Sequence, residues 1–226
     1  MFAATLFDYN GVLVDDEDLH FAAFAEVMQP FGVELSRDGY VARYMGFDDV
    51  GAFRAMLDDA GMAYDDARVR ELVELKKPVY ARRAERGLAI FPGAGAAVRA
   101  LSALGPVGVV SGALRSEIEL GLELLNVREL VKFVVAAEDT LSCKPDPEGY
   151  RLALQRLGEV APRSVLVVED SLAGVQAARA AGTTCVAVCH SYSEAELRRA
   201  GADWVLPTVE ELSPAQVQEL ALKLHA

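Results

Sequence analysis

The chain has 226 residues and lacks any apolar run approaching the roughly 18 residues that a helix needs to cross a membrane. Its N-terminus also lacks the basic segment, long apolar stretch and small-residue cleavage site of a secretory signal peptide. Hydrophobic residues make up 52% of the chain and charged residues 25%, which is typical of a globular protein with a substantial core. We therefore predict a cytoplasmic protein that has no membrane partner.

Positive charge is also scarce, because 22 Lys and Arg residues stand against 34 Asp and Glu residues. The formal net charge is −12, and no predicted element carries a continuous stripe of basic side chains. Nucleic-acid binding depends on neutralising phosphates with such side chains, so nucleic acid is disfavoured as a partner. We expect a small-molecule ligand and a monomeric chain.

Cysteine and histidine are rare, with three residues of each. Cys143, Cys185 and Cys189 are odd in number and do not form a disulfide framework, which favours reduced thiols. Cys185 and Cys189 lie in an apolar run without the His and Cys partners of a zinc finger, and we interpret the adjacent His190 as a loop residue. A zinc site is therefore not expected.

A helical block follows the first apolar run of the chain. Apolar residues recur at helical spacing in this block, and no convincing strand pattern occurs between residues 16 and 88. Asp48 and Asp65 are expected to act as N-caps, and Pro78 is expected to kink or break the last helix. The predicted helices span residues 15–31, 36–44, 48–60 and 65–85.

Strands and helices alternate in the remainder of the chain, which predicts parallel strands joined by right-handed crossovers in an α/β fold. The first strand ends at Asp8, and the later strands are expected at residues 107–110, 133–136, 165–168, 185–188 and 204–206. The helices between and after them are expected at residues 93–104, 114–125, 148–157, 172–181, 193–200 and 214–224.

Polar residues follow the ends of several of these strands, and the carboxyl ends of parallel strands meet at one edge of a sheet. Three carboxylates without a thiolate or paired histidines favour a hard divalent cation, for which Mg²⁺ is the natural candidate. A cation, a lysine and a hydroxyl around a buried carboxylate can stabilise the oxygens of a transferring phosphoryl group. The residues expected to converge are Asp8, Ser111, Lys144, Glu169 and Asp170.

Four segments, in chain order, resemble the four motifs of the haloacid dehalogenase superfamily: DYNGVLVDDE, VVSG, SCKPDPEGY and VVEDSLAGVQAARAAG. The resemblance covers nearly the full chain and is closest to the phosphatase and β-phosphoglucomutase-like branch. It implies a Rossmann-like parallel-sheet core, residues 1–15 and 89–226, with an inserted all-helical cap domain, residues 16–88. It also implies Mg²⁺ dependence and an aspartyl-phosphate intermediate.

The resemblance implies that Asp8 is the nucleophile, that Ser111 donates a hydrogen bond to the phosphoryl oxygens and that Lys144 neutralises charge. Each residue taken singly also suits a turn, a helix cap or a solvated loop, and their ordered coincidence favours a site.

The resemblance also implies a metal site. Asp170 and Asp8 would bind Mg²⁺ together with the backbone carbonyl of Asn10. Glu169 would act through a ligated water or by holding Lys144. This acidic pair argues against dehalogenation, because family members that act on haloacids work without a metal.

Asn10 departs from the family pattern, which has a second aspartate at this position as general acid and base. An amide can perform neither role, and such catalysis is typically worth about 10²–10⁴-fold in rate. Three explanations are open: an introduced Asp-to-Asn change, a native residue of a slow enzyme that recruits another acid, or a phospho-ligand binder without turnover. All the other motifs are intact, so we favour a phosphatase whose present form is impaired.

In the family the cap closes over the site and contacts the part of the substrate other than phosphate. The candidate substrate-binding residues are His20, Gly46 and Lys76 (or its neighbour Lys77) in the cap and Gly112 in the core. His20 also suits a capping or surface role, and lysines on a helix are usually solvated. Asp48 and Asp49 occur where a β-phosphoglucomutase would bring an arginine onto a second phosphate.

We therefore predict a Mg²⁺-dependent phosphomonoesterase acting on a small, sugar-like phosphate. The alternatives are a β-phosphoglucomutase-like mutase and a non-catalytic phosphometabolite-binding protein.

Overall fold

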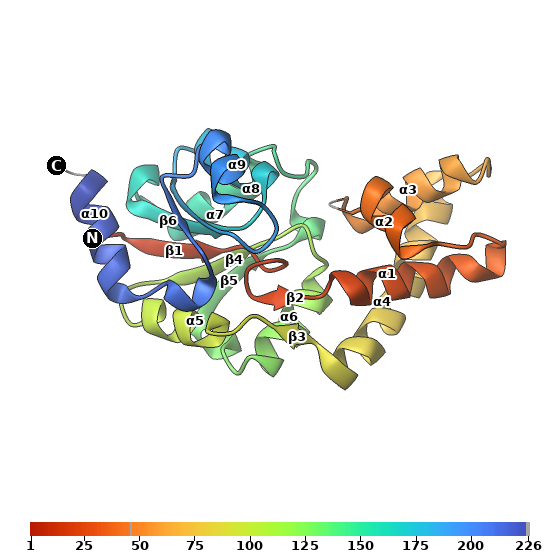
Figure 1. Cartoon of the computed structure of the whole chain (residues 1–226), viewed down its shortest axis with the longest axis horizontal. Coiled ribbons are helices and arrows are strands. Elements are labelled where there is room, and N and C mark those ends of the chain that lie inside the picture. The colour runs from red at the N-terminus through yellow and green to blue at the C-terminus, as the bar shows by residue number, and fades with distance from the viewer. Residues whose placement is uncertain (46, 225–226) are drawn as a thin grey trace. The chain divides into compact units, whose positions relative to one another are not determined.

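The computed structural model describes residues 1–45 and 47–224 of the chain (Figure 1). The chain divides into two compact units, one formed by Met1–Asp15 with Ile90–Ala226 and the other by Asp16–Ala89. The first unit holds a six-stranded sheet with helices on both faces, and the second holds the helices α1 to α4. None of the helices in the described part of the chain combines the length and apolar character that a membrane span requires.

The sheet is parallel throughout, with the strand order β5-β4-β1-β6-β7-β8. Strands β1, β4, β6 and β7 are buried along their whole length, as expected where helices cover both faces of a parallel sheet. The α/β fold class is thereby confirmed. The strands are β1 (Ala4–Phe7), β4 (Val107–Val110), β5 (Val131–Val135), β6 (Val165–Glu169), β7 (Thr184–Val188) and β8 (Trp204–Leu206).

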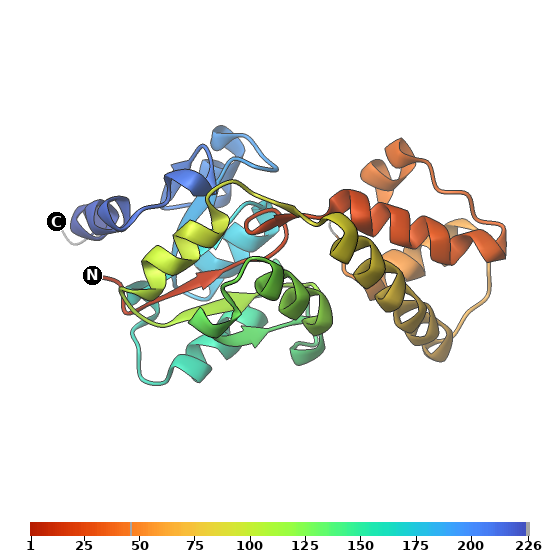
Figure 2. The same ribbon diagram turned by 90° about the horizontal axis from the view of Figure 1, so that it is seen from below.

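Figures 1 and 2 show α5 and α6 on one face of the sheet and α7, α8 and α9 on the other. From β1 the order of strands moves outward to β4 and β5, then returns across β1 to β6, β7 and β8. The direction reverses beside β1, and ligands of open α/β sheets bind beyond the strand ends at such a reversal. The helices of this unit are α5 (Ala94–Ser102), α6 (Arg115–Leu124), α7 (Glu148–Leu157), α8 (Leu172–Ala180), α9 (Glu194–Ala200) and α10 (Pro214–Leu224).

The second unit packs its helices around an aromatic core in which the rings of Phe24 and Phe53 meet edge to face at 4.9 Å. The two predicted N-caps are confirmed, because Asp48 accepts from the Gly51 N–H at 2.7 Å and Asp65 accepts from the Arg68 N–H at 2.8 Å. Its helices are α1 (Glu17–Met28), α2 (Arg37–Arg43), α3 (Asp49–Asp59) and α4 (Asp66–Gly87).

The sequence predicted a kink or break at Pro78, and a break there is wrong because α4 continues through this residue. Proline has no N–H and removes one intrahelical hydrogen bond. Val79 and Tyr80, which follow Pro78, are buried, as are Val69, Leu72 and Val73 earlier in the helix. The free energy gained by packing this face of α4 outweighs the loss of one hydrogen bond. Two strands of two residues, β2 (Val14–Asp15) and β3 (Ala89–Ile90), form a separate small sheet that is too short for a periodic signal.

Gly121 of α6 supports the buried ring of Tyr9, which follows the end of β1. A Cβ atom on Gly121 would lie 1.9 Å from the Tyr9 hydroxyl oxygen, and this hydroxyl donates to the Glu117 carbonyl at 3.1 Å. Gly121→Ala therefore has to displace a ring in a packed core, and we expect the free energy of unfolding to fall by about 1–3 kcal/mol. Urea denaturation followed by circular dichroism measures this change.

Gly87→Ala is the control, because Gly87 ends α4 and a Cβ there would meet nothing within 4 Å. Its stability should be unchanged or slightly raised. Equal losses in the two variants would contradict the proposed close contact of Gly121.

Candidate active site

Asp8 lies at the carboxyl end of β1, beside the reversal of strand order. Its N–H donates to the Val168 carbonyl at 2.9 Å, which continues the pairing of β1 with β6 and places Asp8 next to the end of β6. Its Oδ1 accepts from the Tyr9 N–H at 2.8 Å and lies 3.0 Å from Lys144 Nζ. The Asp8 side chain is buried, and the Tyr9 N–H and the Lys144 ammonium group hold it in place.

Gly11 makes the turn after Asp8 possible, because its φ of +73° is strained for any residue with a side chain. A Cβ atom at this position would also lie 2.1 Å from Asp170 Oδ2. The backbone of the turn thus runs directly against the Asp170 carboxylate.

Glu169 ends β6 and is fully buried. Its Oε1 accepts from Lys144 Nζ at 2.6 Å and from the Tyr150 hydroxyl at 2.7 Å. Its Oε2 accepts from the Asp170 N–H at 3.2 Å and from the Ser171 hydroxyl at 3.1 Å. Glu169 therefore holds Lys144 in place, which is one of the two roles implied by the family resemblance.

Burial and crowding raise the pKa of two carboxyl groups in this cluster. Burial, followed by the charge of Glu169, raises the pKa of Asp8 to about 7 and that of Asp170 to about 8. Burial alone would lower the pKa of Lys144, but the charges of Asp8 and Glu169 outweigh it and hold that pKa above its usual value. One lysine thus faces three carboxyl groups, and the cluster has an excess of negative charge.

One carboxylate oxygen from each of Asp8, Glu169 and Asp170 can be chosen such that all three lie within 4.8 Å of one another. This set consists only of hard oxygen donors, which suits a divalent cation that prefers carboxylates. A bound cation would also offset the repulsion among these carboxylates, which adds to the effect of burial on the two pKa values. The residues present therefore fit a metal ion.

Ser111 begins the loop after β4, where its N–H donates to the Val135 carbonyl at 3.0 Å. Its hydroxyl donates to Asn10 Oδ1 at 3.1 Å and accepts from the Ala113 N–H at 3.1 Å. The structure thus brings Ser111 and Asn10 together from segments about a hundred residues apart in the sequence.

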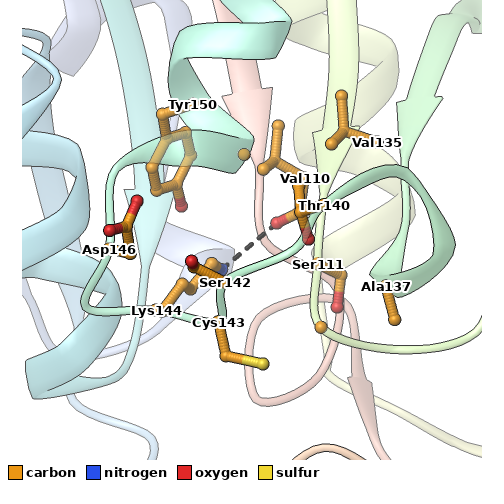
Figure 3. A pocket seen from close by; sticks show the side chains of 12 residues that line it. Val110, Ser111, Val135, Ala137, Thr140, Ser142, Cys143, Lys144, Asp146 and Tyr150 are labelled. Atoms are coloured by element: carbon orange, nitrogen blue, oxygen red, sulfur yellow. Dashed lines mark hydrogen bonds between the residues drawn. The ribbon is translucent and has the colours of Figure 1, made fainter.

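Ser111, Gly112 and Lys144 also line a small recess of about 30 Å³ beside the cluster (Figure 3). Figure 3 shows Lys144 reaching Val110, whose carbonyl accepts from its Nζ at 3.2 Å. The volume has room for about two water molecules.

Tyr150 and Gly174 support the site and were not singled out from the sequence, although both lie inside the segments that resemble family motifs. Tyr150 is buried and bonds Glu169, and a Cβ on Gly174 would lie 1.9 Å from Glu169 Oε1. Only the fold shows that α8 passes this close to the carboxylate.

The predicted substrate-binding residues His20 and Lys76 meet within the helical unit. Lys76 is fully buried, and its Nζ lies 2.8 Å from His20 Nδ1 and 2.6 Å from Asp49 Oδ1. His20 Nε2 lies 3.2 Å from Asp16 Oδ2. Gly46 lies outside the described residues, and the substrate-binding roles of these residues stay predictions.

The parallel sheet and the acidic cluster at its strand ends match a class of enzymes that hydrolyse phosphoric monoesters on a Rossmann-like core. The chain belongs to the haloacid dehalogenase-like hydrolase family, whose pattern matches residues 5–188. This confirms the resemblance seen in the four motifs.

Two curated relatives illustrate the range of the family. Validoxylamine A 7'-phosphate phosphatase from Streptomyces hygroscopicus subsp. limoneus is 31% identical over 214 residues, 94% of this chain and 96% of that protein. SUPPRESSOR OF QUENCHING 1 from Arabidopsis thaliana is 34% identical over 217 residues, which are 93% of this chain but 20% of that protein. The chain thus matches nearly the full length of the first relative and about a fifth of the second.

Crystal structures of CbbY from Rhodobacter sphaeroides share the fold. The complex with phosphate gives a TM-score of 0.85 at 26% identity and covers 96% of this chain and 100% of that one. A mutant with an aspartate changed to asparagine, in complex with xylulose-(1,5)bisphosphate, gives 0.84 at 27% identity, with coverages of 95% and 98%.

The raised pKa values predict how stability depends on pH in protein stripped of divalent cations. Asp8 and Asp170 have folded-state pKa values of about 7 and about 8, against 3.8 for an unperturbed group. The folded state therefore retains protons that the unfolded state releases above about pH 4, and this stabilising contribution is lost as the pH rises through 7 and 8. We expect the free energy of unfolding to fall by about 1–3 kcal/mol between pH 6 and 9.

Urea denaturation in the presence of EDTA measures this dependence. Asp170→Asn removes one titrating carboxyl group and should give a flatter profile. A wild-type stability that is constant or rises over this range would contradict the predicted effect of burial and crowding on the two pKa values.

Proposed function

We propose that the protein is a Mg²⁺-dependent phosphatase that hydrolyses a small, sugar-like phosphate monoester through an aspartyl-phosphate intermediate. The observation that supports this proposal best is the buried cluster in which one oxygen of Asp8 lies 3.0 Å from Lys144 Nζ, beside Glu169 and Asp170. A carboxylate that is held between a lysine and a cation-binding acidic pair suits attack on phosphorus.

Asp8, Asp170 and the backbone carbonyl of Asn10 would hold the metal ion. When bound, Mg²⁺ would supply positive charge that polarises the phosphoryl group and screens its oxygens from Asp8. The described residues fit this role because their carboxylates outnumber the one lysine beside them.

The residues of the chain divide the reaction into two displacements. A carboxylate oxygen of Asp8 forms a bond to phosphorus while the bond from phosphorus to the ester oxygen breaks. Lys144 and the Ser111 hydroxyl stabilise the charge on the phosphoryl oxygens. Water then attacks the phosphorus of the acyl phosphate, which releases inorganic phosphate and regenerates Asp8.

Asn10 limits both displacements. The leaving oxygen needs a proton in the first step and the attacking water must lose one in the second, and an amide side chain serves neither need. Its Oδ1 accepts from Ser111 at 3.1 Å, so the amide remains part of the polar network of the site. We propose that this chain binds its substrate well and turns it over slowly.

The comparisons support a sugar-like substrate. One relative of matching length is named as the phosphatase of a validoxylamine phosphate, and the CbbY mutant was crystallised with a sugar bisphosphate. In the helical unit, Asp49 and Lys76 form a buried ion pair at 2.6 Å. Because the two charges balance, this pair offers no net positive charge to a second phosphate. We therefore favour a monophosphate over a bisphosphate or a mutase reaction.

Asn10 itself supports a second candidate, a protein that binds a phosphometabolite without turnover. Such a protein would bind phosphosugars tightly and remain inactive after the acid is supplied. The two candidates are separated by one substitution.

Asn10→Asp is expected to raise kcat by about 10²–10⁴-fold, because it supplies the general acid and base. Release of inorganic phosphate from a panel of sugar monophosphates and bisphosphates, with Mg²⁺ and with EDTA, measures the gain. Activity should require Mg²⁺ and be lost in the double variant Asp8→Ala with Asn10→Asp. No gain on any ester, together with tight phosphosugar binding by calorimetry, would favour the non-catalytic candidate.

A further inference from the structure

His190 lies in the loop after β7 and contacts three segments that are distant from it in the sequence. Its ring stacks on Phe91 with the centroids 3.9 Å apart and an angle of 15° between the planes. Its Nδ1 lies 2.7 Å from the carbonyl oxygen of Gly11, and its Nε2 lies 3.3 Å from the backbone N–H of Val209. All of these residues belong to the unit that contains the sheet.

The partners of the ring define its tautomer. Val209 donates its N–H, so Nε2 is the acceptor and carries no proton. Nδ1 therefore carries the proton and donates it to the Gly11 carbonyl. Burial lowers the pKa of His190, which agrees with a neutral ring in this geometry.

The turn that follows Asp8 touches Asp170 at Gly11, where a Cβ atom would overlap with the Asp170 carboxylate. The residue after His190, Ser191, bonds the same carboxylate, because its hydroxyl donates to Asp170 Oδ2. His190 thus bonds the turn that carries Asp8 and Asn10, and Ser191 bonds the Asp170 carboxylate that lies against this turn.

We infer that His190 is a positioning residue that fixes the Asp8–Val14 turn against Asp170 and so sets the spacing of the acidic cluster. Its action is indirect, since it bonds the carbonyl of Gly11 and touches neither substrate nor metal. The effect on cation binding rests on the proposed function, whereas the effect on the turn stands on the hydrogen bonds alone.

Two variants separate the functions of the ring. His190→Phe keeps an aromatic ring that can stack on Phe91 and removes both hydrogen bonds. His190→Asn removes the stacked ring but places an amide N–H where Nδ1 stood, so it can donate to Gly11 again. Tyr192→Phe is the control, because Tyr192 is a neighbouring loop residue with 39% of its surface exposed.

Amide hydrogen exchange of the metal-free protein, measured by mass spectrometry, tests the effect on the turn. The amides of Gly11, Leu13 and Val14 are protected by hydrogen bonds within the turn. His190→Phe should speed their exchange at least about 10-fold relative to wild type, while exchange in β6 stays unchanged. His190→Asn should recover most of the protection, and the control variant should match wild type.

Binding of Mn²⁺, followed by electron paramagnetic resonance, tests the effect on the acidic cluster. His190→Phe should weaken binding about 10-fold, in the range that applies to groups orienting metal ligands, and His190→Asn should restore it. Unchanged exchange of the turn in His190→Phe would overturn the inference. Equally faster exchange in β6 would also overturn it, because the ring would then be supporting the fold as a whole.

The two proposals fail in different ways. A wild-type chain that binds no Mn²⁺, and whose Asn10→Asp variant releases no phosphate, would contradict the proposed function. Faster exchange confined to the turn in His190→Phe would still establish the positioning role. Conversely, an active Asn10→Asp variant with unchanged turn exchange in His190→Phe would overturn the positioning role alone.

Discussion

The burial of three carboxyl groups around one lysine is the constraint on which the site depends. Burial disfavours the charged form of each carboxyl group and the charge of Glu169 adds to this effect, so the pKa values of Asp8 and Asp170 rise to about 7 and about 8. Lys144 offsets only part of this charge through its contacts with Asp8 and Glu169. A fold that maintains such a cluster is suited to a cation and to a phosphoryl group that the cation and the lysine stabilise together.

The surrounding residues keep this unfavourable cluster in one arrangement. Glu169 is held by Tyr150 and by its own following loop, and Gly174 leaves space for it beside α8. Gly11 and His190 perform the matching task on the Asp8 side. These four residues contact either a carboxylate of the cluster or the turn beside it, and all of them therefore lie near the ends of β1 and β6.

In the proposed function, Asn10 bears on turnover and the Asp49–Lys76 pair bears on selectivity. Asn10 accepts a hydrogen bond from Ser111 but lacks the proton chemistry of an acid, and this is why we propose that the chain binds its substrate better than it turns it over. In the helical unit a fully buried lysine is balanced by a carboxylate, and a buried pair of this kind stays neutral as a whole. In the proposed reaction, the cluster of Asp8, Lys144, Glu169 and Asp170 positions the reacting groups.

The sequence by itself determined the parallel α/β sheet, the helical insertion, the caps at Asp48 and Asp65, and the set of residues at the strand ends. These features are local, because a strand that is buried on both faces must read as an apolar run and must end where polar residues follow. Only the tertiary structure decided that Tyr150 and Gly174 contact Glu169, that His190 bonds the Gly11 carbonyl, that Lys76 is paired with Asp49, and that α4 continues through Pro78. These outcomes depend on which elements pack together, and a side chain's neighbours across a sheet or between helices leave no periodic signal in the sequence.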